Sequence, residues 1–212
     1  VAEYAIAILF YILKNFDYYF DYRNNRLKKL NKIPTKTLYK KKIGLIGYGA
    51  IGKRIQSLMK GFENNFFINN YSKKIKNNNQ QKIQTIKKIL ELSDIIFICV
   101  PLTPKTKNLI NKDNSKILKN KIIINISRAE VIDPNAVKSL IKHNILIYDS
   151  NYSDKKKSKE LEDKKSKNLL LSHYIAAIDE FASFPLSHIA TNLINYSIKG
   201  RLINYVDYEK EY

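Results

Sequence analysis

The sequence has 212 residues, of which 44% are hydrophobic and 27% are charged, a composition typical of a folded chain with one large or two small domains. Its one cysteine, Cys99, excludes an internal disulfide, so we expect a cytoplasmic protein. The longest apolar run, residues 5–13, is shorter than the roughly 20 residues of a membrane span, so no membrane partner is expected.

The formal net charge is +19, and clustered basic side chains would attract nucleic acid or an anionic membrane surface. However, 33 of the 38 basic residues are lysines, and they are scattered over every polar stretch. Nucleic-acid-binding surfaces more often use arginine with interleaved aromatic residues. We therefore interpret the lysines as a solvated surface and expect no nucleic-acid partner. A basic protein that binds nucleic acid or a membrane surface is kept as an alternative function, which rests on charge alone.

The first predicted element is a long helix from Ala2 to about Tyr19, because its apolar side chains are distributed almost all round. The next stretch, Asp21 to Lys42, is rich in basic residues and asparagine and contains Pro34. This composition predicts an irregular connection over the surface.

Short apolar runs then recur at intervals long enough to hold a helix. They lack polar alternation, which is typical of strands buried on both faces in a parallel sheet. The predicted strands are Ile43–Ile46, Phe66–Ile68, Ile95–Val100, Ile122–Ile126, Ile145–Tyr148 and Leu169–Leu171. Helical stripes lie between several of them, at residues 51–59, 83–90 and 136–141. The fold class is therefore α/β, with a doubly wound parallel sheet of the Rossmann type.

Two segments complete the chain. Lys155–Lys167 is rich in charge and predicts either a solvated helix or a mobile loop. Asp179–Lys199 predicts a final helix that Gly200 ends, followed by a short tail.

A glycine motif follows the first predicted strand directly. Gly47, Gly49 and Gly52 have the G-x-G-x-x-G spacing, and Ala50 and Ile51 open the next helical stripe. The first glycine permits a tight turn, the second lets a pyrophosphate approach the backbone, and the third allows close helix packing. Free amides at a helix start bind anions, so the motif predicts a dinucleotide site.

The segment after the second strand bears on the choice of cofactor. An NAD site usually carries an acidic residue there for the ribose hydroxyls, whereas this segment offers Asn70, Ser72 and Lys73. No carboxylate would repel a 2′-phosphate, so NADP is favoured over NAD. The alternative is that the lysines at this turn reflect only the overall composition.

Further segments, in the same order and spacing, carry a family resemblance. They are Val1-Ala2-Glu3, the glycine motif, the run Val100 to Thr106, Asn125 to Arg128, and Tyr148-Asp149. With them the chain resembles the D-isomer-specific 2-hydroxyacid dehydrogenases, and the Ser72 turn and the Val206-Asp207 ending are most similar to the glyoxylate/hydroxypyruvate reductase A group. The resemblance implies cofactor contacts from Val100, Pro101, Thr106, Ile126, Ser127 and Asp149.

The resemblance also implies a reaction, the reduction of a small 2-keto acid to a D-2-hydroxy acid by hydride transfer. Arg128 matches the arginine that holds the substrate carboxylate. The general acid of the family is a histidine oriented by a carboxylate. Asp154 takes the carboxylate position, whereas strict register puts Tyr174 in the histidine position with His173 before it. Proton donation by His173, donation by Tyr174 and loss of activity are the three alternatives.

The resemblance finally implies a domain organisation. Residues 1–175 correspond to the dinucleotide-binding domain, and residues 176–212 to a C-terminal helix and tail that return towards a substrate domain, which would precede residue 1. A homodimer is expected. No metal site is expected, because the three histidines and one cysteine lack ligand spacing. The competing function is a non-catalytic dinucleotide-binding module.

Overall fold

The structure is a computed structural model, and it describes residues 1–24, 26, 29, 31–69, 81–164, 166–178 and 184–200. The chain divides into two units, Val1–Ala176 and Ala177–Tyr212.

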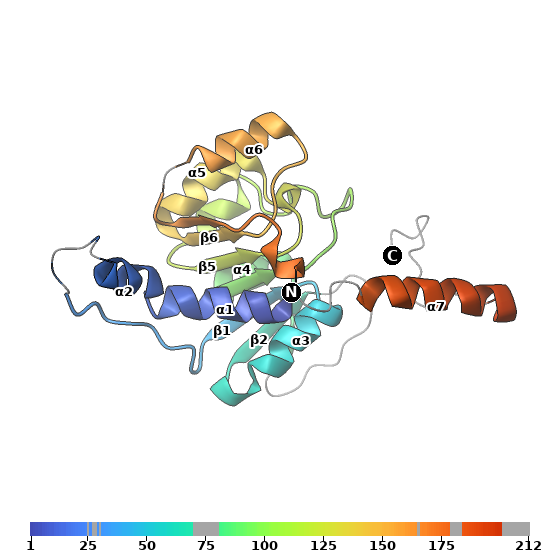
Figure 1. Ribbon diagram of the computed structural model, residues 1–212. Helices are drawn as coiled ribbons and strands as arrows, with labels where there is room; N and C mark the ends of the chain where they lie inside the picture. The colour runs from blue at the N-terminus through green and yellow to red at the C-terminus, as the bar shows by residue number, and fades with distance from the viewer. Residues whose placement is uncertain are drawn as a thin grey trace. The chain divides into compact units, whose positions relative to one another are not determined.

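The first unit is built on a parallel sheet (Figure 1). Within the described residues this sheet has seven strands, in the order β3-β2-β1-β4-β5-β6-β7. The strands are β1 (Lys42–Ile46), β2 (Asn65–Asn69), β3 (Gln81–Ile83), β4 (Ile95–Ile98), β5 (Ile122–Asn125), β6 (Ile145–Tyr148) and β7 (Leu169–Leu171). The order runs outward from the β1–β4 pair in both directions, which confirms the doubly wound sheet. It also creates a topological switch point at the carboxyl ends of these two strands.

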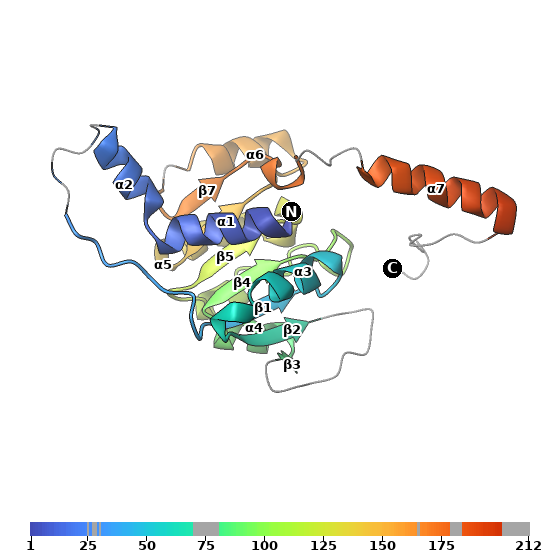
Figure 2. The same cartoon turned by 60° about the horizontal axis from the view of Figure 1, so that its bottom comes forward.

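Helices cover both faces of this sheet (Figure 1, Figure 2). Ile96 and Ile98 of β4 belong to the apolar cluster formed with α4 (Ile86–Leu92) and α5 (Pro134–His143), whereas Ile95 and Phe97 belong to the opposite cluster. That opposite cluster includes α1 (Ala2–Leu13) and α3 (Ala50–Leu58). Because both faces are buried, successive strand residues are all apolar, and this explains the unbroken runs in the sequence.

The long N-terminal helix expected from the sequence is wrong in its extent. α1 ends at Leu13, and a second helix, α2, spans Phe16–Arg23. Asn15 lies between them in the left-handed conformation, with φ of 51°, and its side chain donates a hydrogen bond to the carbonyl of Pro34. Asparagine tolerates this backbone conformation better than most residues, so it breaks the apolar pattern into two helices. The irregular connection expected from residue 21 therefore begins after Arg23.

One strand was not predicted. β3 is a three-residue strand that ends at Ile83, a residue that the apolar pattern assigns to a helical stripe. The helix that follows, α4, begins only at Ile86, where the hydroxyl of Thr85 caps it by accepting from the Lys88 amide. Three residues are too few to show a strand period in the sequence.

The remaining predicted helices of this unit are present. Asp133 caps α5, and Pro134 occupies its first turn. The lysine-rich insert contains α6 (Lys155–Glu162), so of the two interpretations the solvated helix is confirmed. Short 3₁₀ turns in the described ranges include η1 (Lys60–Phe62), η2 (Asn114–Ile117), η3 (Ala129–Val131) and η4 (Ile175–Ala177).

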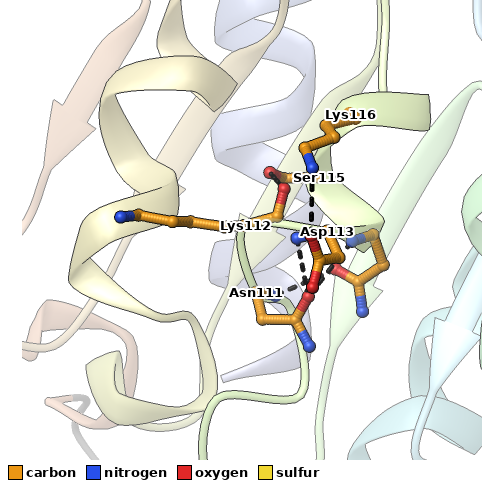
Figure 3. Close-up of polar contacts among 6 residues, drawn as sticks. Asn111, Lys112, Asp113, Ser115 and Lys116 are labelled. Atoms are coloured by element: carbon orange, nitrogen blue, oxygen red, sulfur yellow. Dashed lines mark hydrogen bonds and ion pairs between the residues drawn. The ribbon is translucent and has the colours of Figure 1, made fainter.

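The η2 turn on the β4–β5 connection is held by polar side chains. Asn111 Oδ1 accepts from the Asp113 and Asn114 amides, and Lys116 pairs with Asp113 at 3.0 Å, while Lys112 extends away from this pair (Figure 3). These contacts stabilise the connection locally, and the pattern is the usual way in which asparagine initiates a turn.

The second unit contains α7 (Phe184–Lys199). Gly200 ends this helix with φ of 63°, and its amide donates to the Tyr196 carbonyl, which confirms the predicted stop. The predicted start, at Asp179, lies outside the described residues. Within the part of the chain that the structure describes, no helix has the length and apolarity needed to cross a membrane.

Candidate active site

The turn after β1 can be made only by glycine at its first position. Gly47 has φ of 96°, and a Cβ placed on it would lie 2.8 Å from the backbone of Cys99, which follows β4. Gly47 donates its amide to the carbonyl of Asn69 at the end of β2. The turn therefore joins the ends of three neighbouring strands, and no side chain fits between them.

The other two glycines have different surroundings. A Cβ on Gly52 would lie 2.5 Å from the Gly47 carbonyl oxygen, so this glycine allows α3 to pack against the turn. A Cβ on Gly49 would meet nothing within 4 Å. Gly49 caps α3 without a side-chain hydrogen bond, so the first amides of the helix, at Ala50 and Ile51, have no side-chain cap. This arrangement fits an anionic group such as a pyrophosphate.

A cavity of about 480 Å³ lies beside this turn. Three segments line it, from the start of α3, the end of β4 and the end of β5, which meet at the switch point of the sheet. The lining residues are Ile51, Cys99, Val100, Pro101, Leu102, Ile126, Ser127 and Arg128. Five of them were predicted as cofactor contacts and one as the substrate-binding arginine, so the structure brings these residues together.

Cys99 and Leu102 were not predicted to line the site. Burial raises the pKa of the Cys99 thiol to about 12, so it is protonated at neutral pH and serves as an apolar wall. Its position directly after a buried strand, at the switch point, is the signal that could have identified it.

Thr106 shapes the wall of the cavity from behind. It is buried, its hydroxyl donates to the Pro101 carbonyl at 2.6 Å, and the Thr103 amide donates to the same hydroxyl at 2.8 Å. The hydroxyl is therefore occupied within its own turn. In this structure Thr106 positions Pro101 and does not offer a free hydroxyl to a ligand.

Arg128 is exposed at the edge of the cavity. Its Nη1 atom donates to the carbonyl of Ser127, and among the described residues no carboxylate lies within ion-pair distance. The buried Asn125 holds this loop, because its amide nitrogen donates to the Arg128 carbonyl and its amide oxygen accepts from the backbone and hydroxyl of Ser127. Within the described part of the chain the guanidinium thus has no ion-pair partner, and at the edge of the cavity it can bind a carboxylate.

Glu130 joins the loops that follow β5 and β6. Its Oε1 atom accepts from the Ser153 amide at 2.5 Å. Burial acts to raise the pKa of this carboxyl, but hydrogen bonds from Ser153, its own amide and the charge of Arg128 outweigh burial, so the pKa is lowered. Its role in fixing these loops was not predicted.

Asp149 organises the turn that carries the candidate proton donors. It is buried, its Oδ1 accepts from the Ser172 hydroxyl at 2.6 Å, and its Oδ2 accepts from the Ala176 amide at 3.0 Å. The hydroxyl of Tyr4 in α1 donates to Ser172 in turn. Asp149, predicted to contact a cofactor, thus ties β6 to the turn over residues 172–176.

His173 and Tyr174 lie on this turn, both exposed and both in the left-handed conformation, with φ of 52° and 66°. His173 Nδ1 lies 3.1 Å from Asn151 Nδ2. The Tyr174 hydroxyl donates to the Asn151 carbonyl at 3.3 Å. Both candidate donors thus contact Asn151, which no sequence motif had singled out.

The expected pairing of Asp154 with the histidine is not seen among the described residues. Asp154 caps α6, its carboxylate accepts from the Lys156 and Lys157 amides, and Lys157 Nζ lies 3.8 Å away. No hydrogen bond joins Asp154 to His173 among the described residues. The physical reason is that an aspartate directly before a helix satisfies the free amides of its first turn.

Three predicted cofactor contacts, Asn70, Ser72 and Lys73, lie outside the described residues. Within the described ranges, no group of three histidine, cysteine or acidic side chains is arranged to hold a metal ion.

Comparison with known proteins agrees with this geometry. Residues 6–174 match the family model described as the NAD binding domain of D-isomer specific 2-hydroxyacid dehydrogenases. Over 110 residues the chain is 34% identical to the glyoxylate reductase of Pyrococcus furiosus and 37% identical to that of Pyrococcus horikoshii. Each match covers 50% of this chain and 32% of the relative, so the chain matches about a third of these enzymes.

A solved acyclic imino acid reductase, in complex with NADPH and D-Arg, has the same fold. The TM-score is 0.81 at 22% identity, over 96% of this chain and 66% of that one.

Proposed function

Because the chain belongs to the D-isomer-specific 2-hydroxyacid dehydrogenases through their NAD-binding domain, we propose that it acts as a nicotinamide-dependent reductase of a small 2-keto acid, of the glyoxylate or hydroxypyruvate type. One observation carries this proposal: Arg128, which forms no ion pair among the described residues, lines the same cavity as the start of the glycine-capped helix α3. The site thereby combines a place for a dinucleotide with a cationic fork for a carboxylate.

The residues present fit a nicotinamide dinucleotide. The open face of Gly49 and the amides of Ala50 and Ile51 would hold the pyrophosphate, and the cavity beside them would hold the nicotinamide ring. When bound, the reduced cofactor supplies a hydride. We favour NADP over NAD, because β2 ends in the uncharged Asn69 and the sequence from residue 70 to 74 contains lysines and no acid.

Arg128 would bind the substrate carboxylate and leave the adjacent keto group facing the cavity. Hydride addition to the carbonyl carbon leaves negative charge on the oxygen, which a hydrogen-bond donor must stabilise and which must receive a proton. His173 and Tyr174 are the candidate donors, and Asn125 and Asp149 hold the loops that carry these groups in place.

The proposal is tested by measuring oxidation of NADPH and NADH with glyoxylate and with hydroxypyruvate, using the protein in its full natural length. Arg128→Lys keeps the charge but loses the two-pronged geometry, so we expect kcat/KM to fall at least about 10-fold while cofactor affinity is retained. If the natural-length protein binds cofactor but reduces no 2-keto acid, the reductase proposal is wrong.

A second candidate function is a dinucleotide-binding module without catalysis. It is favoured by the absence of a carboxylate beside His173 among the described residues, because the imidazole contacts the amide of Asn151 instead. Cofactor binding without turnover, in the experiment above, would support this candidate.

We also propose a homodimer. Tyr11, Phe16 and Phe20 form an aromatic cluster over α1 and α2, in which Phe16 and Phe20 are 42% and 54% exposed. Such a cluster on the surface favours association with a second copy.

A further inference from the structure

The amide of Asn151 lies between a carboxylate and an imidazole. Asn151 Nδ2 is 3.1 Å from Glu162 Oε1 and 3.1 Å from His173 Nδ1. A carboxylate oxygen can only accept hydrogen bonds, so the atom that faces Glu162 must be the amide nitrogen and not the amide oxygen. Glu162, at the end of α6, therefore fixes the orientation of the Asn151 amide.

This orientation determines the proton position on the imidazole. The amide nitrogen has two protons, and one is directed to Glu162, so the other is directed to His173 Nδ1. Nδ1 must then accept with its lone pair, and in the neutral ring the proton resides on Nε2. The nearby Tyr174 hydroxyl contacts the Asn151 backbone carbonyl and leaves the side-chain amide undisturbed.

We propose that Asn151, oriented by Glu162, is a positioning residue that holds His173 in the tautomer with the proton on Nε2. The consequence for catalysis rests on the proposed reductase function. In this tautomer Nε2–H can donate a hydrogen bond to a keto oxygen, but losing that proton would leave an imidazolate anion. His173 therefore stabilises the developing alkoxide without protonating it.

The reaction balances without a proton from the ring. The hydride forms the new C–H bond at the carbonyl carbon, the π electrons of the C=O bond move to oxygen, and this alkoxide takes its proton from water, which leaves hydroxide. A carboxylate in the place of Asn151 would instead accept from Nδ1–H, favour the imidazolium and make the ring a true acid.

The tautomer is measured by ¹⁵N NMR of the histidine side chains in the 212-residue chain, at mildly alkaline pH, where imidazoles are neutral. We expect His173 to show a protonated Nε2 and an unprotonated Nδ1. Asn151→Asp should move the proton to Nδ1, because an aspartate at this position can only accept. Asn108→Asp adds the same charge at another exposed site, where no side-chain contact is present among the described residues, and should leave the His173 signals unchanged.

A second variant tests the role of Glu162. Glu162→Gln can present either an oxygen or a nitrogen to Asn151, so the amide is no longer fixed and both tautomers of His173 should appear. Glu160→Gln removes the same charge from the same helix and is the matched control. A proton on Nδ1 in the unmodified chain, or an unchanged single tautomer in both Asn151→Asp and Glu162→Gln, would overturn the inference.

Kinetics separate this inference from the proposed function. In the natural-length protein, Asn151→Asp should raise kcat for keto-acid reduction by about 100-fold, the lower end of general acid catalysis, with little change in KM. If the NMR results are as expected and no variant turns over, the tautomer assignment holds and the reductase proposal fails. If turnover is present but Asn151→Asp lowers kcat, the consequence drawn for catalysis is wrong.

Discussion

Replacing Gly49 by alanine should separate cofactor binding from stability. A Cβ at this position meets nothing within 4 Å, and the backbone φ of −81° lies outside the left-handed region that favours glycine. The loss of glycine at the helix N-cap costs a few tenths of a kcal/mol to about 1 kcal/mol, and the reduced freedom of the unfolded chain offsets about 0.4–1 kcal/mol. The free energy of unfolding should therefore change by less than about 1 kcal/mol.

Affinity for NADPH should respond differently. The new methyl group would occupy the space through which a pyrophosphate approaches the first amides of α3. Losing one hydrogen bond to a charged group costs about 1.5–3 kcal/mol, which corresponds to a rise in Kd of about 10- to 100-fold. Urea unfolding gives the stability, and a titration followed by nicotinamide fluorescence gives the Kd.

Alanine substitutions at two other glycines serve as controls for this experiment. Gly52→Ala places its Cβ 2.5 Å from the Gly47 carbonyl oxygen, so α3 must shift, at a cost of about 1–3 kcal/mol, and both stability and affinity should fall. Gly61→Ala, where a Cβ also meets nothing within 4 Å, should change neither. Normal NADPH binding by Gly49→Ala would refute the placement of the pyrophosphate.

Three further predictions concern stability and assembly. Leu9→Ala in α1 should destabilise the chain by about 2–5 kcal/mol in urea unfolding, because Leu9 is fully buried against the sheet; a loss below about 1 kcal/mol would contradict that packing. The folded-state pKa of Glu130 is lowered, so its carboxylate stabilises the fold above its unfolded pKa, and this contribution is lost as the pH falls through the folded value. Glu130→Gln should therefore lower the thermal midpoint at neutral pH, with a difference from the unmodified chain that shrinks in acid; a pH-independent difference would count against the linkage. Phe20→Asp should convert the proposed dimer to a monomer in light scattering, and an unchanged mass would place the interface elsewhere.

The fold could be predicted because its strands are apolar on both faces. Runs such as Ile122–Ile126 have few other structural interpretations, and their spacing leaves room for one helix each. The structure differs from the prediction where a single residue or a very short segment determines the secondary structure. Asn15 ends a helix by its backbone conformation, which apolar periodicity does not report, and Ile83 belongs to a strand too short to show a period.

The site could be predicted in part for a related reason. The three glycines and Arg128 occupy positions that the chain order of strand and helix already defines, and the structure gathers them around the switch point. The surroundings of His173 could not be predicted, because they depend on tertiary contacts. The spacing of the family motif puts Asp154 where the carboxylate partner of the histidine is expected. In the structure the Asp154 carboxylate instead caps the first turn of α6, and His173 contacts Asn151.

The hydrogen-bond chain from Tyr4 through Ser172 to Asp149 also has a consequence for folding kinetics. Its first link joins residues 168 positions apart, the first turn of α1 and the segment directly after the edge strand β7. Contacts of such sequence separation carry a higher loop-closure cost than local ones and are expected to form later. The turn with His173 should therefore acquire its native shape only after β6 and β7 have joined the sheet and α1 has docked on it. Because the contacts of the glycine turn are more local, we expect the proposed pyrophosphate site to form before the turn that carries His173.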